Sequence, residues 1–212
     1  LRWWDHWLKG LDRGIENDAG YRAYLMDGVR PQTWYNQREG HWIIENGWPE
    51  NIAGSTWQFQ ADSVLSNLTK EQSDLGIKVS SPQDCGIESG EYCAIWLGAE
   101  MPGDQQIDDA KSVNFTSPVL SEKLDIVGAP NIQLSISSDK PAAQIAVRLN
   151  HIHPDGASTR ITYGVFNLAH RNGFDIATPL SPGEVFDVNF SLDQVAYRVP
   201  AGHKIRVSIS SS

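Results

Sequence analysis

The sequence predicts a mainly β protein whose core lies between two antiparallel sheets, as in a β-sandwich or jelly roll. Segments in the second half alternate apolar and polar residues with a period of two, so each strand has one apolar face. Turn sequences such as Pro154-Asp155-Gly156 and Pro182-Gly183 separate these segments. Strands do not alternate with helical segments, which argues against a doubly wound nucleotide-binding fold. The residues assigned to the core face are Ile132, Leu134, Ile136, Ile145, Val147, Leu149, Ile161, Tyr163, Val165, Phe186, Val188, Phe190, Ile205, Val207 and Ile209.

An amphipathic helix is expected over residues 1–13, ahead of the strands. Charged residues occupy one side, and Gly10 and Gly14 weaken and then end the helix. The apolar face consists of Trp3, Trp4, Trp7, Leu8 and Leu11. Three tryptophans on so short a face are more apolar surface than a terminal helix normally shows to water. The helix therefore packs either on its own domain or on a domain that is absent from this chain.

The first half after the helix is expected to form short strands joined by turns. The turn pair Asp27-Gly28 stops the first strand, and residues 66–90 are polar and loop-like. The Pro102-Gly103 break follows a short apolar run. The expected strands and the apolar run are residues 21–26, 42–44, 57–61 and 92–97.

Composition and charge exclude several classes of protein. The 212 residues carry 17 Lys and Arg against 26 Asp and Glu, a net charge of −9. An acidic surface argues against nucleic acid as a partner, and no apolar run reaches the roughly 20 residues that span a membrane. The chain lacks an initiator Met, and both ends look cut, so we interpret it as a piece of a larger protein. No signal peptide is visible, which leaves the compartment open and favours the cytoplasm.

The common catalytic signatures are missing from this chain. No G-x-S-x-G nucleophile elbow, phosphate-binding loop or dinucleotide-binding G-x-G-x-x-G occurs. The string Gly86-Ile87-Glu88-Ser89-Gly90 has Glu where the serine should be. A Ser-His-Asp triad cannot be inferred from composition, because triads are recognised by geometry.

His151 and His153 are the one pair that suggests a metal. On a strand they share a face, so two imidazoles could hold one ion. They also end a strand and precede a turn, and the only further ligand nearby is Asp155, which the turn itself needs. We therefore expect a solvent-side pair, with no metal and no cofactor.

The remaining polar candidates have simpler structural interpretations. Cys85 and Cys93 could close a hairpin disulfide in an oxidising compartment, and two reduced thiols are the favoured alternative. The carboxylates expected to be solvated loop charges are Glu88, Glu91, Asp108 and Asp109. The aromatic residues that could stack on a sugar are Trp34, Tyr35 and Trp42, although packing in the core and at interfaces is favoured.

Several motifs, in their order and spacing, resemble one family of enzymes. They are Arg2-Trp3-Trp4-Asp5-His6-Trp7-Leu8-Lys9-Gly10, Gly28-Val29-Arg30-Pro31, Gly40-His41-Trp42, Trp48-Pro49, Pro102-Gly103-Asp104-Gln105, Thr116-Ser117-Pro118-Val119-Leu120, Arg148-Leu149, Pro154-Asp155-Gly156, Pro182-Gly183 and Gly202-His203-Lys204-Ile205-Arg206-Val207. Each motif is weak alone. Together they resemble the C-terminal part of the X-Pro dipeptidyl-peptidase and cocaine-esterase-like serine hydrolases, across nearly the whole chain.

The resemblance implies a division into two parts. Residues 1–19 would be the terminal helix and linker of an absent α/β-hydrolase domain, with Trp3, Trp4 and Trp7 at the interface between domains. Residues 20–212 would be a C-terminal jelly-roll β-sandwich, galactose-binding-domain-like and truncated at its C-terminus. The catalytic Ser-Asp-His triad would lie upstream of Leu1, so this chain should hold no catalytic residue.

The resemblance also implies partners and a substrate contact. The partners would be the protein's own hydrolase domain and a small ester or peptide substrate, and a homo-oligomer is left open. The apolar run before the Gly-Asp-Gln string would reach the cleft, with Tyr92, Ile95 and Trp96 facing substrate, or Trp96 would merely seal the domain interface. An independent carbohydrate- or peptide-binding module is the alternative function, and a structural oligomerisation domain is a third.

Overall fold

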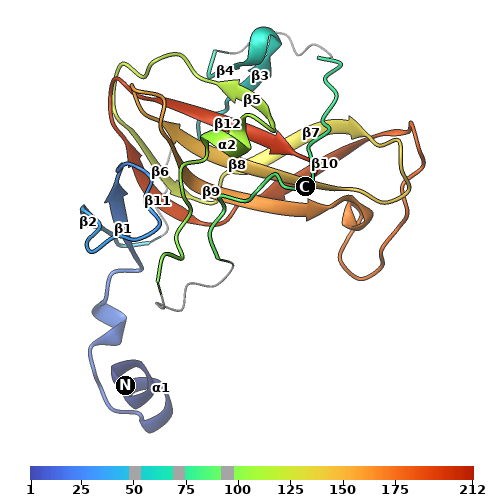
Figure 1. The fold of residues 1–212 in the computed structure, drawn as a ribbon. Coiled ribbons are helices and arrows are strands. Elements are labelled where there is room, and N and C mark those ends of the chain that lie inside the picture. Colours follow the sequence, from blue (N-terminus) through green and yellow to red (C-terminus); the bar gives the residue numbers. More distant parts are fainter. Residues whose placement is uncertain (48–53, 69–74, 92–97) are drawn as a thin grey trace.

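The computed structural model describes residues 1–47, 54–68, 75–91 and 98–212. In these ranges twelve strands form three sheets (Figure 1). The six-stranded sheet has the order β3-β4-β5-β12-β8-β9, the four-stranded sheet β2-β1-β11-β6, and the two-stranded sheet β10-β7. The strands are β1 Tyr21–Asp27, β2 Gly40–Glu45, β3 Gln58–Gln60, β4 Val64–Ser66, β5 Val113–Thr116, β6 Leu124–Gly128, β7 Asn131–Ser137, β8 Gln144–Ile152, β9 Ser158–Asn167, β10 Val185–Ser191, β11 Val195–Val199 and β12 Lys204–Ser210. The prediction of a mainly β fold is confirmed.

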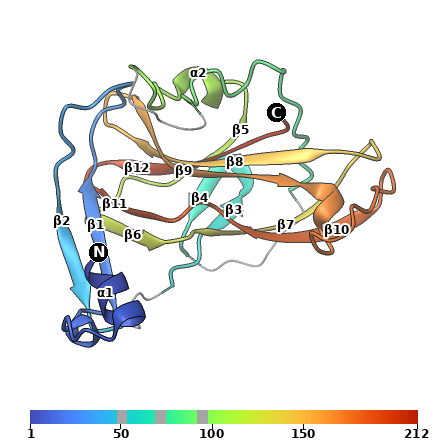
Figure 2. The same cartoon turned by 90° about the horizontal axis from the view of Figure 1, so that it is seen from below.

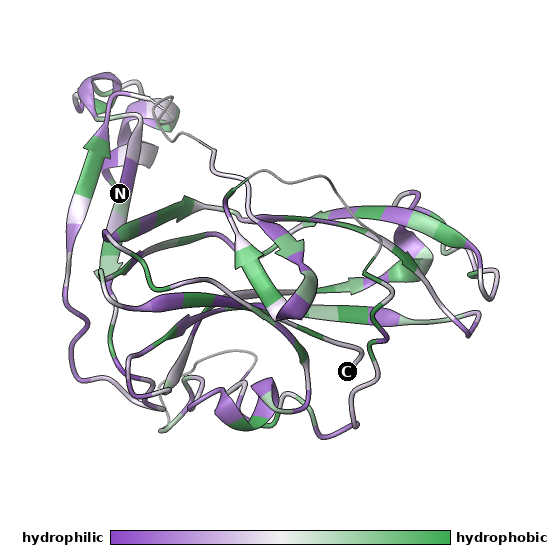
Figure 3. Ribbon diagram, turned by 90° about the horizontal axis from the view of Figure 1, so that it is seen from above, coloured by the Kyte–Doolittle hydropathy of each residue, from purple (hydrophilic) through white to green (hydrophobic). Residues whose placement is uncertain are grey.

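The core lies between the six-stranded sheet and the layer formed by the other strands. Figure 2 shows β12, β8 and β9 along one layer and β6, β7, β10 and β11 along the other. Apolar and polar residues alternate along these strands (Figure 3), as a sheet with one covered face requires. The buried side chains that fill the space between the layers include Phe115, Ile132, Ile145, Val147, Leu149, Val188, Phe190, Tyr197, Val199, Ile205, Val207 and Ile209. The predicted core faces of β7, β8, β10 and β12 therefore hold.

The predicted facing of β9 is wrong at Tyr163 and Val165, whereas Ile161 packs against the core as predicted. Its core face carries Thr162, Gly164 and Phe166, which lie opposite Leu149, Val147 and Ile145 of β8. Val165 is 57% exposed on the outer face, whereas Val147 is fully buried. The pairing of β8 with β9 shifts register next to Leu149, so one residue of β9 is inserted as a bulge. Since the side-chain period of a strand is two, alternation alone cannot say which set faces the core.

The structure contains short helices besides the strands. Helix α1, Arg2–Lys9, ends at Gly10 in the left-handed conformation, earlier than the predicted residue 13. Single turns are η1 Ile15–Asn17, η2 Ala61–Ser63 and η3 Leu168–His170, and a short helix is α2 Gln106–Asp109. Helix α1 lies apart from the sandwich and buries none of its residues (Figure 1). No helix in the described ranges is long and apolar enough to cross a bilayer.

The outer face of the six-stranded sheet is covered by α2 and the segment before it (Figure 2). The prediction that Asp108 and Asp109 are solvated loop charges is wrong, because both are buried. Asp109 accepts hydrogen bonds from Asn150 and Ser208 at 2.8 Å each and from Ser158 at 2.9 Å. Helix α2 thus supplies a carboxylate that accepts hydrogen bonds from polar side chains of the sheet. These hydrogen bonds allow the charged side chain of Asp109 to be buried.

Candidate functional site

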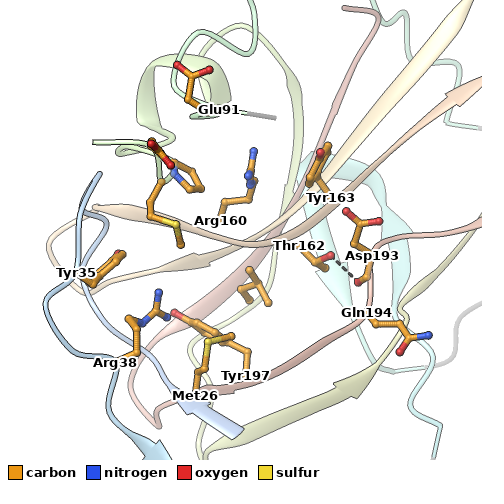
Figure 4. A pocket seen from close by; sticks show the side chains of 14 residues that line it. Met26, Tyr35, Arg38, Glu91, Arg160, Thr162, Tyr163, Asp193, Gln194 and Tyr197 are labelled. Carbon is orange, nitrogen blue, oxygen red and sulfur yellow. Dashed lines mark hydrogen bonds between the residues drawn. The ribbon is translucent and has the colours of Figure 1, made fainter. Parts of the chain in front are cut away.

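A pocket of about 310 Å³ opens between β9, β11 and loops that precede and follow β9 in the chain (Figure 4). Strand β9 contributes Arg160 and Tyr163, and strand β11 contributes Tyr197. The loop between β1 and β2 contributes Tyr35 and Arg38. Residues 160–163 all line the pocket although they are consecutive, which the bulge in β9 explains, since a bulge redirects side chains.

Two arginines line the pocket together with the carboxylates of Glu91, Glu100 and Asp193. The Arg38 guanidinium lies 4.4 Å from the centre of the Tyr35 ring, and that of Arg160 lies 4.5 Å from the centre of the Tyr163 ring. Burial lowers the pKa of Arg160 from its ordinary value, and a guanidinium nonetheless keeps its charge at neutral pH. Nε of Arg38 is buried without a hydrogen-bond partner among the described residues. A buried donor of this kind suits an oxygen acceptor from a ligand or from another domain.

Carboxylates stand on the other side of the same pocket. Glu91 and Glu100 line it, and the backbone N–H of Glu91 donates to the carbonyl of Glu100 at 2.9 Å. These two residues flank the predicted cleft segment. The predicted cleft residues Tyr92, Ile95 and Trp96 lie outside the described residues, as does Cys93.

A cluster of three histidines lies directly behind the pocket. The prediction of a solvent-side pair is wrong, because His151 and His153 are buried. His203, just before β12, joins them, and its Nδ1 lies 2.6 Å from Nε2 of His151. Nδ1 of His151 lies 2.9 Å from the hydroxyl of Tyr197, which also lines the pocket. Burial, followed by the other two histidines, lowers the pKa of His151 to about 3, so this ring is neutral.

Strand pairing explains why sequence reasoning missed His203. Strand β12 pairs antiparallel with β8, with Ile205 opposite His151 and Lys204 opposite Ile152. In this register His203, the residue before β12, lies beside His153, the residue after β8. Only the knowledge that these two strands are neighbours could have revealed the third histidine, and alternation does not provide strand order.

Hydrolytic chemistry of the serine type has no support within this chain. In the part that the structure describes, no hydrogen bond joins a serine hydroxyl to a histidine. Cys85 is a buried free thiol whose Sγ lies 3.7 Å from the carbonyl of Asp108. A general base oriented toward a nucleophile is what such chemistry needs.

The comparison with known families decides what kind of domain this is. Residues 13–212 match the family described as the X-Pro dipeptidyl-peptidase C-terminal non-catalytic domain. The chain belongs to this family. The match begins after α1, so the tryptophan helix precedes the matched domain.

Individual relatives of this X-Pro dipeptidyl-peptidase C-terminal domain are distant. A Mycobacterium bovis protein named as a serine esterase is 25% identical over 233 residues, covering 100% of this chain and 35% of the relative. A Bacillus anthracis protein named as an Xaa-Pro dipeptidyl-peptidase is 22% identical over 214 residues, covering 100% of this chain and 32% of the relative. The chain therefore spans about a third of the length of the curated relatives it matches.

A solved structure shares the fold of this X-Pro dipeptidyl-peptidase C-terminal domain. The crystal structure of an aminopeptidase from a marine sediment Thaumarchaeota archaeon superposes with a TM-score of 0.64 at 22% identity. It covers 100% of this chain, and the chain covers 36% of that protein.

The tryptophans of α1 form an apolar surface on this family member. Trp3, Trp4 and Trp7 are 56%, 58% and 53% exposed, and none packs on the sandwich. Trp3 and Trp7 face each other with ring centres 5.7 Å apart. Of the two expectations for this helix, packing on its own sandwich is not what the structure shows.

The aromatic candidates for sugar stacking have three different surroundings. Arg38 covers the ring of Tyr35, whose hydroxyl donates to the carbonyl of Arg30 at 2.8 Å. Trp34 donates from Nε1 to Asn36 at 3.0 Å, and Trp42 is exposed on β2. A stacking platform needs ring faces open to the ligand. The covered face of Tyr35 makes this set a poor platform.

Proposed function

We propose that this chain is an accessory C-terminal domain of a serine hydrolase, a jelly-roll sandwich of the galactose-binding type. In this proposal it packs on an α/β-hydrolase domain of the same protein and helps to wall the active-site cleft. The description of its family as non-catalytic supports this role, as does its span of about a third of the relatives' length.

The exposed tryptophan face of α1 is the single observation that carries the proposal. Three half-exposed tryptophans leave roughly 400 Å² of apolar surface in water, and covering it is worth on the order of 10 kcal/mol before entropic costs. Patches of this size on a monomer mark interaction sites. The position of α1 ahead of the matched residues 13–212 suits a helix that belongs with the preceding catalytic domain.

The pocket is the proposed contribution to the cleft. It lies next to the flanks of the apolar run that contains Tyr92, Ile95 and Trp96, the residues we propose to contact substrate. Trp96 alternatively seals the interface between the two domains. The unpartnered Nε of Arg38 supplies a donor for a carbonyl or carboxylate oxygen of the substrate or the catalytic domain.

The reaction proposed for the whole protein is acyl transfer to water. The substrate is a small ester or the amide bond that follows an Xaa-Pro dipeptide. A serine attacks the carbonyl carbon, a histidine carries the proton from the serine to the leaving group, and backbone N–H groups stabilise the oxyanion. All these groups belong to the catalytic domain, so this chain contributes no catalytic residue.

The test replaces tryptophans in the longer protein that contains this chain. Trp3→Ala together with Trp7→Ala should lower its melting temperature and its hydrolase activity, because both remove an interface contact. Trp42→Ala, a similarly exposed tryptophan on β2, is the matched control; it should leave the hydrolase activity unchanged and lower the melting temperature only by the loss of its contact with the Tyr24 ring. Unchanged stability in the double variant would contradict the proposed interface.

A glycan panel separates this function from a binding module. The proposal expects no change in the tryptophan fluorescence of the chain on titration with neutral or charged oligosaccharides. Saturable quenching that Trp34→Ala or Trp42→Ala removes would instead establish a carbohydrate-binding module.

A further inference from the structure

Three histidine rings lie together at one end of the β8–β12 pair. One potential ligand atom from each of His151, His153 and His203 lies within 4.8 Å of the others. The rings of His151 and His153 stack with centres 4.0 Å apart, and the ring of His203 lies 4.8 Å from that of His151. No acidic residue is part of this group, so its donors are imidazole nitrogens alone.

Two of the three rings have their second nitrogen bound to a hydroxyl. Nε2 of His153 lies 3.0 Å from Oγ1 of Thr159, which itself donates to the carbonyl of Val29 at 2.8 Å. Because the hydroxyl proton of Thr159 is already donated to Val29, the hydroxyl oxygen accepts from Nε2–H of His153. Nδ1 of His153 therefore keeps its lone pair. The hydroxyl of Tyr197 lies 2.9 Å from Nδ1 of His151, so this contact holds the ring with Nε2 toward His203. Histidines that bind metals are oriented in this way by a partner on the other nitrogen.

The contact between His151 and His203 is short for a hydrogen bond between neutral rings. Its 2.6 Å lies below the usual range of about 2.7–3.2 Å for N–H donors. Two imidazoles that share an ion at about 2.0–2.1 Å from each nitrogen stand further apart than this. To bind an ion, His203 must rotate outward at the surface side of the group, and the ring of His153 must turn out of its stack on His151, because an ion lies in the plane of each imidazole that binds it.

The backbone encloses the buried end of the cluster. A Cβ atom on Gly28 would lie 2.8 Å from Cε1 of His151, so the chain passes directly over this ring. His203 is only partly buried and gives access from solvent. Arg30 and Asp104 act on His153 electrostatically with opposite sign, and Arg30 forms an ion pair with Asp155 that offsets its charge.

We propose that His151, His153 and His203 form a binding site for one divalent transition-metal ion of the Zn²⁺ type. Three neutral imidazoles suit Zn²⁺, Co²⁺ or Cu²⁺ better than Mg²⁺ or Ca²⁺, which prefer oxygen ligands. A water molecule completes the four ligands on the side of His203. The ion joins β8 to β12 directly, and through Thr159 and Tyr197 it joins the segment after β1 and the wall of the pocket.

A Co²⁺ titration of the metal-free, tag-free protein tests the site. The proposal expects one equivalent of Co²⁺ to produce the visible absorption of a four-coordinate ion, and Zn²⁺ to displace it and raise the melting temperature. His203→Asn places an amide where Nδ1 stood, so it can keep the hydrogen bond to His151 while it removes a metal ligand. Loss of a residue that only hydrogen-bonds to a metal ligand weakens binding by about 10- to 100-fold. The His203→Asn variant loses a ligand itself, so its Co²⁺ affinity should fall by more than that. Tyr197→Phe, which removes such an outer partner, should weaken binding within that 10- to 100-fold range.

Matched variants exclude other sources of binding. His41→Ala removes an exposed histidine on β2 and Cys85→Ser removes a buried thiol, and both should retain full binding. Circular dichroism of each variant checks that it is folded. No absorption at one equivalent in the folded protein, or equal binding by His203→Asn, would overturn the proposal and leave three histidines that only hydrogen-bond.

Discussion

Arg206 of β12 donates from Nη1 to Oδ2 of Asp109 at 3.1 Å, although 97 residues separate them. The carboxylate also accepts from Asn150, Ser158 and Ser208, and Arg148 lies 3.6 Å away. One buried side chain therefore joins α2 to three strands of the six-stranded sheet. This carboxylate therefore links the polar outer face of the sheet to α2.

Removal of this carboxylate should destabilise the domain strongly. Asp109→Ala leaves buried donors without their acceptor and the buried Arg148 charge without this carboxylate, which costs about 3–5 kcal/mol in the free energy of unfolding. Asp139→Ala, whose side chain is 88% exposed, is the control and should change stability by less than about 0.5 kcal/mol. Urea denaturation of both variants measures the difference. Equal stability of the two would show that the network contributes nothing.

The facing of the sandwich strands has its own matched pair of variants. Val147→Asp places an unpaired charge in the core and should unfold the domain. Val165→Asp, one strand away on the outer face, should be tolerated with a change under about 1 kcal/mol. Thermal melts followed by circular dichroism compare them. If Val147→Asp melts like the wild type, the strand facing is wrong.

Acid should weaken the pairing of β6 with β11. Arg198 binds both carboxylate oxygens of Asp125, at 2.6 and 2.8 Å, and this hydrogen bonding lowers the pKa of Asp125 below its ordinary value of 3.8. Because the folded-state pKa is the lower one, the pair adds stability above that ordinary value and loses it as the pH falls through the folded-state pKa. For a partly exposed pair the contribution stays below about 1 kcal/mol.

Asp125→Asn removes this acid dependence. Urea midpoints of the wild type and the variant should differ near pH 7 and converge as the pH falls below 3.8 and through the lower folded-state pKa of Asp125. A difference that grows toward low pH would contradict the assigned direction.

The substrate contact proposed for Trp96 is tested on kinetics. In the longer protein, Trp96→Ala should raise KM or lower kcat more than it lowers the melting temperature, because a residue of the cleft touches substrate. Trp34→Ala is the control outside that segment. An unchanged kinetic profile with a lower melting temperature would assign Trp96 to the domain interface.

The sequence predicted the parts of the fold that depend on local pattern. Alternation in β8 and β12 assigned Val147 and Val207 to the core correctly, because long strands with one apolar face have a clear period. It failed for Val165 because a bulge in β9 shifts the register, and a bulge has no signature in the alternation. Strand β11 was not predicted, although Tyr197 and Val199 alternate and are buried.

The candidate site depends on contacts between distant segments and was largely hidden in the sequence. His203 meets His151 only because β12 lies beside β8, and Asp109 is buried only because the loop before β5 folds over the sheet. Strand order and loop placement are set by tertiary packing, which local periodicity does not encode. The tryptophan face of α1 was visible in the sequence because a helical period needs only its own residues.

A hydrolysis assay of the purified chain tests the central claim most directly. The folded 212-residue chain is incubated with a chromogenic short-chain ester and with an Xaa-Pro amide, and the longer protein serves as the positive control. The account predicts turnover by the longer protein and none by the chain. Turnover of either substrate by the chain itself would contradict the assignment of this domain as non-catalytic.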